Sequence, residues 1–206
     1  MASTINASTA SGGGVITTAD ASGILQLQTA GVTALTIDAS QNVTFAKSIL
    51  TSATAQASTS GTSIDFTGIP SWVKRITVMF SGVSTSGTSG MRFQFKVGGT
   101  AVTSNYTASM FAITTAISAS VGTAVTNGFP LSIAGTGSAQ SGQIVFSQLS
   151  TDIWVGNGSF YDNNPTERIA VIAGRAFSVG TVDGIRVTTT GGTDTFDAGS
   201  INIMYE

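Results

Sequence analysis

The sequence predicts an all-β protein, and three observations lead to this prediction. Charged residues make up only 9% of the 206 residues, against about 25% in an average domain, so the helix formers Lys, Glu and Arg are scarce. Thr, Val and Ile are frequent instead, and their β-branched side chains suit a pleated strand. The 25 glycines supply the positive-φ positions that many tight turns need. Short strands joined by frequent turns are therefore expected along the chain.

Residues 1–22 consist mostly of Ala, Ser, Thr and Gly, with almost no apolar side chains to bury. Such a segment is flexible when alone. It predicts either a disordered tail or an anchoring arm that becomes ordered against a partner. The sequence leaves both interpretations open.

Three short apolar runs follow between residues 23 and 50, separated by turn signals at Gly31 and at 38–40. Three strands with one apolar face each do not make a stable unit alone, whereas three copies wrapped about an axis can. We therefore expect a short trimeric β shaft or β-prism here, in preference to a β-meander packed on the main domain. The apolar residues of this attachment region are Ile24, Leu25, Leu27, Val32, Leu35 and Ile37.

Residues 51–61 have little apolar content and predict a linker, so a domain boundary is expected near them. From residue 62 to residue 206 short strands alternate with turns, which predicts an antiparallel β-sandwich of jelly-roll-like type. The clearest strand is 91–97, where every second residue from Met91 is apolar, a pattern typical of a half-buried strand. Further strands are predicted at 64–66, 73–80, 101–103, 109–114, 131–133, 143–148, 153–155, 168–172, 185–189 and 200–205.

Chemical function is limited by what the sequence lacks. It contains no histidine and no cysteine, which removes the commonest general base, the commonest transition-metal ligand and all thiolate chemistry. The ten acidic residues mostly lie beside Gly, Ser, Asn or Thr, where a short carboxylate side chain caps a turn. Asp194 and Asp197 share a loop that could wrap a hard cation, but two carboxylates are few for calcium, and the turn interpretation is preferred. We therefore predict no enzyme activity, no catalytic or metal-binding residues and no cofactor.

The charge and hydropathy patterns bear on possible partners. The net charge is −2 and no basic cluster exists, so nucleic-acid binding is not expected. The N-terminus lacks the pattern of a signal peptide, and no window approaches about 20 consecutive apolar residues, so membrane insertion is not expected. A surface with so little charge has little colloidal repulsion. Such chains usually hide part of their surface in a permanent assembly, and we predict an obligate homo-oligomer.

Four aromatic residues are candidates for contact with a receptor or with another subunit: Tyr106, Trp154, Phe160 and Tyr161. They are predicted to lie in or near loops, and the last two have Asn, Ser and Asp neighbours. Aromatic rings among amides and a carboxylate suit sugar binding, but they suit a subunit interface equally well. The interface is the preferred interpretation.

Stretches near both ends of the chain resemble a known family. VITTAD at 15–20, LQLQT at 25–29 and VTALTI at 32–37 resemble the N-terminal region of many fibre and virion-surface proteins of tailed bacteriophages. IPSWVKRIT at 69–77 and the segment 185–203 are similar to a β domain that recurs at the C-terminus of those proteins.

The resemblance implies a homotrimer located in the phage virion, after assembly in the host bacterial cytoplasm. The N-terminal part would bind other virion proteins (capsid, portal or tail), and the sandwich would contact the host surface or a glycan. Two alternatives stay open. One is a capsid decoration or head-fibre (cement) protein that stabilises the shell, and the more remote one is a polysaccharide depolymerase. The family supplies no catalytic residues.

Overall fold

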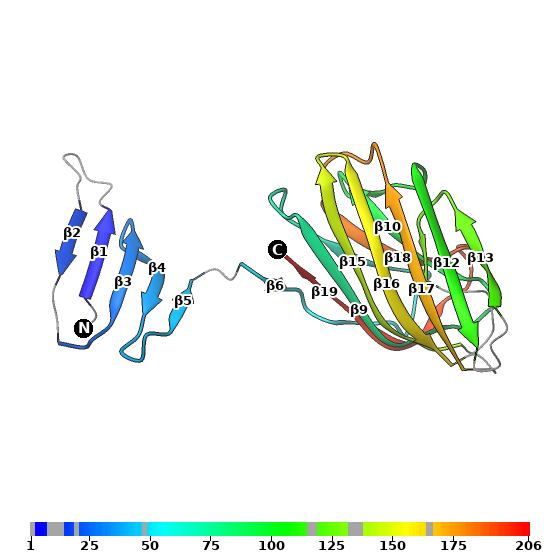
Figure 1. The fold of residues 1–206 in the computed structure, drawn as a ribbon, viewed down its shortest axis with the longest axis horizontal. Helices are drawn as coiled ribbons and strands as arrows, with labels where there is room; N and C mark the ends of the chain where they lie inside the picture. Colours follow the sequence, from blue (N-terminus) through cyan, green and yellow to red (C-terminus); the bar gives the residue numbers. More distant parts are fainter. Residues whose placement is uncertain are drawn as a thin grey trace. The chain divides into compact units, whose positions relative to one another are not determined.

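The computed structural model describes residues 3–7, 15–18, 21–46, 49–114, 119–131, 138–163 and 167–206. These residues form strands, turns and irregular segments, and no helix occurs among them. The described part of the chain accordingly has no helix long and apolar enough to cross a membrane. The chain divides into two compact units, Met1–Leu50 and Thr51–Glu206 (Figure 1). The prediction of an all-β protein is confirmed.

The N-terminal unit is one five-stranded sheet with the strand order β2-β1-β3-β4-β5. Its strands are β1 (Ser3–Ala7), β2 (Val15–Thr18), β3 (Leu25–Thr29), β4 (Val32–Ile37) and β5 (Val43–Phe45). The β1–β3 pair is parallel and the other pairs are antiparallel. In the register of the sheet, Leu27 lies opposite Ile5 on one side and Leu35 on the other. Leu35 in turn lies opposite Phe45, so these four side chains share one face.

The segment 1–22 differs from the predicted flexible or anchoring arm, because 3–7 and 15–18 are strands of this sheet. Apart from residues 21 and 22, the rest of that arm lies outside the described residues. The physical reason is local. Ile5 and the run Val15-Ile16-Thr17-Thr18 are β-branched and favour extended backbone. β1 then pairs with β3, and β2 pairs with β1, so that backbone N–H and C=O groups of both segments find partners within the chain itself.

The second unit consists of two antiparallel sheets packed face to face, a β-sandwich-like arrangement. The larger sheet has the order β13-β12-β17-β16-β15-β9-β19-β6, with β7 also paired to β19. Its strands are β6 (Thr51–Ser52), β7 (Gln56–Ala57), β9 (Arg75–Thr85), β12 (Tyr106–Thr114), β13 (Ala119–Val125), β15 (Gln140–Ser150), β16 (Ile153–Asp162), β17 (Arg168–Ala176) and β19 (Phe196–Tyr205).

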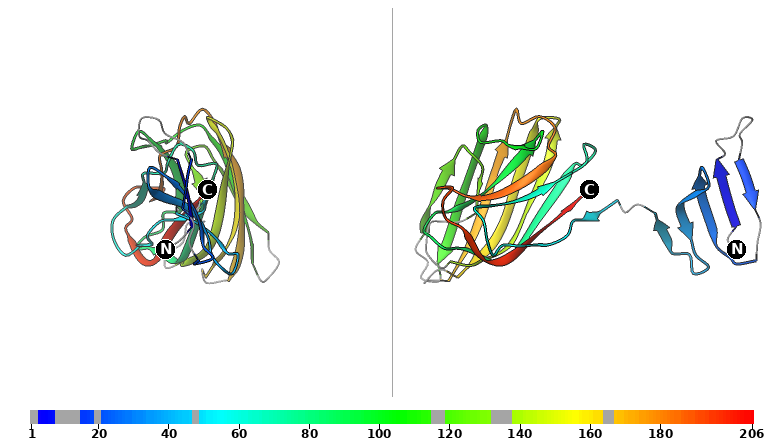
Figure 2. Two further views of the ribbon diagram at one scale, coloured as in Figure 1. Left: turned by 90° about the vertical axis from the view of Figure 1, so that its left-hand side faces the viewer. Right: turned by 180° about the vertical axis from the view of Figure 1, so that it is seen from behind.

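The smaller sheet has the order β11-β10-β18-β8, with β14 also paired to β10. Its strands are β8 (Ser63–Thr67), β10 (Met91–Val97), β11 (Thr100–Ala101), β14 (Phe129–Pro130) and β18 (Gly184–Thr189). In Figure 1 the larger sheet forms the near layer, with β10 and β18 behind it, and Figure 2 gives the reverse view. The predicted strand 131–133 lies outside the described residues beyond Leu131. Every other strand predicted after residue 62 overlaps an observed one.

The predicted linker at 51–61 is instead part of this second unit. Strands β6 and β7 both pair with β19. Ser58 is fully buried; its N–H donates to the carbonyl of Gly199 at 2.9 Å and its hydroxyl to the carbonyl of Ala198 at 2.8 Å. Backbone pairing at a sheet edge holds this segment, so its lack of apolar side chains is a poor guide to its structure. The boundary between the units falls at Leu50.

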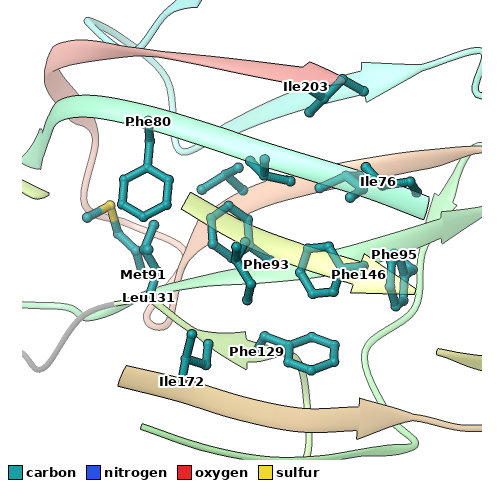
Figure 3. Close-up of a cluster of buried hydrophobic side chains, with 14 of the residues drawn as sticks. Ile76, Phe80, Met91, Phe93, Phe95, Phe129, Leu131, Phe146, Ile172 and Ile203 are labelled. Atoms are coloured by element: carbon teal, nitrogen blue, oxygen red, sulfur yellow. The ribbon is translucent and has the colours of Figure 1, made fainter. Parts of the chain in front are cut away.

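The core lies between the two sheets and is rich in aromatic rings (Figure 3). Phe95 of β10 packs edge-on against Phe146 of β15, with ring centroids 5.1 Å apart. Phe129 of β14 lies 4.9 Å from the same Phe146 ring. Edge-to-face rings such as these contribute beyond their buried area. The apolar face predicted for 91–97 is confirmed, because Phe93 and Phe95 are each 1% exposed.

Strand β10 is nevertheless buried on both faces rather than half-buried. Arg92, Gln94 and Lys96, which alternate with the core side chains, are only 9%, 6% and 5% exposed. The Gln94 amide donates to the carbonyl of Asn127 at 2.7 Å, and a guanidinium N–H of Arg92 donates to the carbonyl of Thr190 at 2.8 Å. Segments that come before β14 and after β18 therefore lie against the outer face of this strand. Alternation in the sequence shows which side chains face the core, but not what covers the other face.

Candidate functional site

Three of the four aromatic residues predicted to contact a receptor or a subunit belong to the core instead. Tyr106, Trp154 and Phe160 are 1%, 2% and 3% exposed, so the prediction is wrong for them. The Tyr106 hydroxyl accepts a hydrogen bond from the backbone N–H of Phe95 at 2.9 Å, and burial raises the pKa of Tyr106. Tyr161 is 42% exposed and stays a candidate for surface contact.

For Phe160 the reason for this difference is the glycine content of β16. Its Asn, Gly and Ser residues are typical of a loop, and the sequence therefore predicts one there. In the structure they form a long strand. The side of this strand that faces the core carries glycines as well as aromatic rings. A Cβ atom on Gly156 would lie 2.6 Å from Cδ1 of Phe146, so the glycine leaves room for that ring.

The attachment residues lie on the N-terminal sheet, and most of them share its apolar face. Ile24, which directly precedes β3, is the exception. The apolar face consists of Ile5, Leu25, Leu27, Val32, Leu35, Ile37, Val43 and Phe45. The opposite face is formed by Thr and Gln side chains, including Gln26, Gln28, Thr36 and Thr44. Leu25, Leu27 and Phe45 are 36%, 39% and 48% exposed. None of the residues of this unit whose side-chain burial the structure describes is buried.

A second exposed apolar surface lies on the outer face of the larger sheet. It consists of Phe111, Ile113, Tyr161, Ile169 and Val171, named here the outer patch, which are 41%, 48%, 42%, 59% and 48% exposed. Phe111 lies opposite Val171 in the sheet register. Ile169 lies between Ile113 and Tyr161. Directly opposite side chains are about 5 Å apart, so the five side chains are contiguous. Sequence reasoning missed this surface; its signal is β12, where both alternating sets of side chains contain apolar residues.

The strongest charge cluster is on the smaller sheet. Arg186 makes two hydrogen bonds of 2.7 Å with the Asp65 carboxylate, one from Nε and one from Nη2. The Nζ atom of Lys96 lies 2.5 Å from Oδ2 of the same carboxylate. The hydrogen bond from Arg186, followed by that from Lys96, holds the pKa of Asp65 below its usual value. Two cations therefore share one carboxylate here.

Other carboxylates fasten turns and loops. Asp38 accepts hydrogen bonds from the backbone N–H groups of Ser40 and Asn42, both at 2.9 Å, and the Asn42 side chain helps to lower its pKa. The Asp194 carboxylate accepts the backbone N–H of Ser89 at 2.7 Å. In the described part of the chain, no three acidic side chains lie close enough together to hold a metal ion.

Comparison of the chain with protein-family models, with curated proteins and with solved structures found no match. The resemblance to phage virion proteins therefore stays a prediction.

Proposed function

We propose that the protein is a homotrimeric structural protein of a bacteriophage virion. Its N-terminal unit forms a short trimeric shaft that attaches it to other virion proteins. Its second unit, a jelly-roll-like sandwich, is exposed for contact with the host surface or with a glycan.

The apolar face of the N-terminal sheet is the observation that carries this proposal. A one-layer sheet has no core of its own, and three or more strands need their apolar face covered to be stable. Most apolar residues of β3, β4 and β5 lie on one face and most polar ones on the other, which is typical of a sheet that packs on one side. In β2 the register places Ile16 on the polar face instead. Residues 1–50 contain only three charged residues, Asp20, Asp38 and Lys47, so copies of this unit have little charge repulsion to overcome.

Further copies of the same chain are the simplest cover for this face. Complete burial of a Leu, Ile or Phe side chain stabilises by about 1.5–3 kcal/mol, so covering a half-exposed one contributes roughly 1 kcal/mol. Summed over eight side chains on each of three faces, this stabilisation is about 24 kcal/mol, which is comparable with the cost of the two association steps of a trimer, about 4–15 kcal/mol each. The base of a fibre has to stay assembled, and this requires a permanent interface between its subunits. A trimer that buries this face provides such an interface.

The outer patch favours a second candidate, a capsid decoration or head-fibre protein. Five contiguous apolar side chains on a surface are typical of a contact site rather than of random exposure. If the sandwich lies against the shell, this patch supplies the contact, and the protein stabilises the head instead of reaching towards the host.

Immunoelectron microscopy of intact virions tests the location. Antibodies against residues 51–206 are expected to label the end of a fibre or appendage if the first proposal holds, and the head surface if the decoration proposal holds. Labelling of neither a fibre end nor the head surface would contradict both proposals. Fragile heads with normal tails, in particles that lack the protein, would select decoration.

Analytical ultracentrifugation of the purified full chain tests the trimer separately. A sedimenting species of three times the chain mass of 20.7 kDa is expected at micromolar concentration. A monomer there would refute the oligomer on which the proposal depends.

A further inference from the structure

Arg92 is a buried cation that has no counter-ion among the described residues. Its side chain lies on the outer face of β10 and is 9% exposed. One guanidinium nitrogen, Nη2, donates to the backbone carbonyl of Thr190 at 2.8 Å. The Nε atom is buried and has no hydrogen-bond partner. The ion pairs of the described residues join Arg75, Lys96, Arg168 and Arg186 to carboxylates, but not Arg92.

This arrangement is costly for the free protein. Burial lowers the pKa of Arg92, but a guanidinium has so high an intrinsic pKa that it stays protonated in proteins. A buried charge without a partner destabilises the fold, as does a buried N–H group without an acceptor. Residues of this kind call for an explanation, and an anionic ligand beside the guanidinium that compensates its charge is one.

Arg92 lines an open cavity of about 300 Å³ on the outer side of the smaller sheet. The other polar groups around the cavity are hydroxyls and amides, from Gln94, Thr103, Asn127, Thr188 and Thr190. Its lining contains no carboxylate and no aromatic ring. The cavity therefore combines one cation with several neutral donors and acceptors, and it has no fixed negative charge to repel an anion.

The surroundings of the cavity are positive although the whole chain has a net charge of −2. Gln94 lies between Arg92 and Lys96 on β10 and opposite Arg186 on β18. Lys96 and Arg186 share the single carboxylate of Asp65. Arg92, Lys96 and Arg186 thus outnumber Asp65 and the nearby Asp194, whose carboxylate accepts the N–H of Ser89, and the local excess of positive charge favours an anionic ligand.

We propose that this cavity binds one oxyanion, a carboxylate or a phosphate, carried on a polyhydroxylated molecule such as an acidic saccharide. Because Nη2 is held by Thr190 and Nε is buried, the guanidinium meets the oxyanion through its remaining N–H groups, in charge-assisted hydrogen bonds. The threonine hydroxyls and the amides supply hydrogen bonds to the hydroxyl groups of the carrier. This inference does not depend on a virion location or on the trimer.

A titration of the full-length protein tests the proposal. Glucuronate, inorganic phosphate and neutral glucose are added separately, and binding is followed by calorimetry and by NMR of the arginine Nε–H and backbone amide resonances. Glucuronate, phosphate or both are expected to saturate the site and to shift the resonances of Arg92 and of residues 188–192. Neutral glucose is expected to cause no saturable shift. The two anions distinguish a carboxylate site from a phosphate site.

Arg92→Met is the decisive variant, because Met keeps an unbranched chain of similar length and removes the charge. It is expected to weaken anion binding at least tenfold while leaving the melting temperature equal or higher. Arg75→Met is the matched control, since Arg75 is an exposed arginine in an ion pair with Glu206, and it is expected to bind as the wild type does.

Two results would overturn the proposal: no saturable shift with either anion up to about 20 mM, a limit near 2 kcal/mol of binding energy, or equal binding by Arg92→Met. If that variant fails to fold, the wild-type Arg92 Nε–H resonance decides. A saturable shift of this resonance with an anion supports the site, and an unchanged resonance refutes it.

Discussion

At the scale of single residues, glycines determine how closely the rings of the core pack. Gly156 is buried in β16, next to Phe146 and Phe129. A Cβ atom there would lie 2.6 Å from one ring and 2.8 Å from the other. Both distances are well inside van der Waals contact, and the rings come from different sheets, so they cannot move apart without opening the core.

Gly156→Ala is therefore expected to destabilise the second unit by about 1–3 kcal/mol through overpacking. Chemical denaturation monitored by tryptophan fluorescence measures the change, because Trp154 is buried in the same strand. Ser159→Ala is the control, since Ser159 lies on the exposed face of β16. Equal stability of the two variants would show that the core has room for the extra methyl group.

Asp65 is the other residue on which a local structure depends, because it forms ion pairs with both Lys96 and Arg186. Asp65→Asn leaves these two cations without a carboxylate. Loss of one partner from a fully buried pair costs about 3–5 kcal/mol. The Asp65 side chain is 27% exposed, so water screens part of this loss, and about 2 kcal/mol is expected. Asp152→Asn is the control, because Asp152 lies at an exposed turn and its carboxylate accepts a hydrogen bond from the Ser150 hydroxyl.

The pH dependence of this difference follows from the lowered pKa of Asp65. Its pKa in the folded protein lies below the usual 3.8. As the pH falls below 3.8, the unfolded chain therefore takes up a proton that the folded protein does not. The stabilisation is complete above this pH and is lost as the pH falls through the lowered pKa. Unfolding curves between pH 7 and pH 2 should show the gap between wild type and Asp65→Asn narrowing only at the acidic end; a constant gap would contradict the assignment.

At the scale of elements, β3 illustrates how one strand serves two environments. Leu25 and Leu27 lie on the apolar face of the N-terminal sheet, and Gln26 and Gln28 lie on the polar face. If copies of the chain associate through the apolar face, only that face is sensitive to charge, because an ammonium group is costly to bury in an interface without a partner.

Leu27→Lys is expected to shift the full chain from oligomer to monomer at micromolar concentration, whereas Gln26→Lys leaves the oligomer intact. The two variants add the same charge at neighbouring positions of one strand, so net charge does not explain a difference. Sedimentation velocity distinguishes them. Dissociation by Gln26→Lys alone would place the interface on the polar face.

At the scale of the whole molecule, the chain consists of two units with different requirements. The second unit has an extensive aromatic and aliphatic core of its own. The first has no buried residue among those whose side-chain burial the structure describes. The division at Leu50 predicts that residues 51–206 fold without the N-terminal unit. The segment 51–61 should then contribute to stability as the edge of the larger sheet.

A fragment of residues 62–206 is expected to be less stable than a fragment of 51–206 by about 2 kcal/mol or more. It loses the backbone bonds of Ala53 and Ser58 to β19 and the buried Ser58 hydroxyl bond, and each such bond contributes about 0.5–1.5 kcal/mol net. It also exposes the edge of β19 and should aggregate more readily. Thermal unfolding and light scattering of the two fragments measure both effects; equal stability would restore the linker interpretation.

Much of the fold follows from local patterns in the sequence. Alternation identifies β10 and its core face, and the poverty in helix formers predicts the fold class. The candidate contact residues are less predictable. Composition marks Phe160 as a loop residue because its neighbours are polar and small, whereas neighbouring strands bury it. The outer patch forms only when β12, β16 and β17 pair in register. These strands are separated in the sequence, so local patterns do not predict which of their residues become neighbours.

The sequence by itself determined that this protein is built from β strands, because propensity and alternation are properties of adjacent residues. It also determined the amphipathic pattern of residues 23–50. Only the tertiary structure decided that Tyr106, Trp154 and Phe160 are core residues and that 51–61 closes a sheet edge. Only the tertiary structure decided that Arg92 is buried beside a polar cavity whose lining contains no carboxylate. Burial and charge compensation depend on which distant strands and loops meet, and adjacent residues carry little information about that.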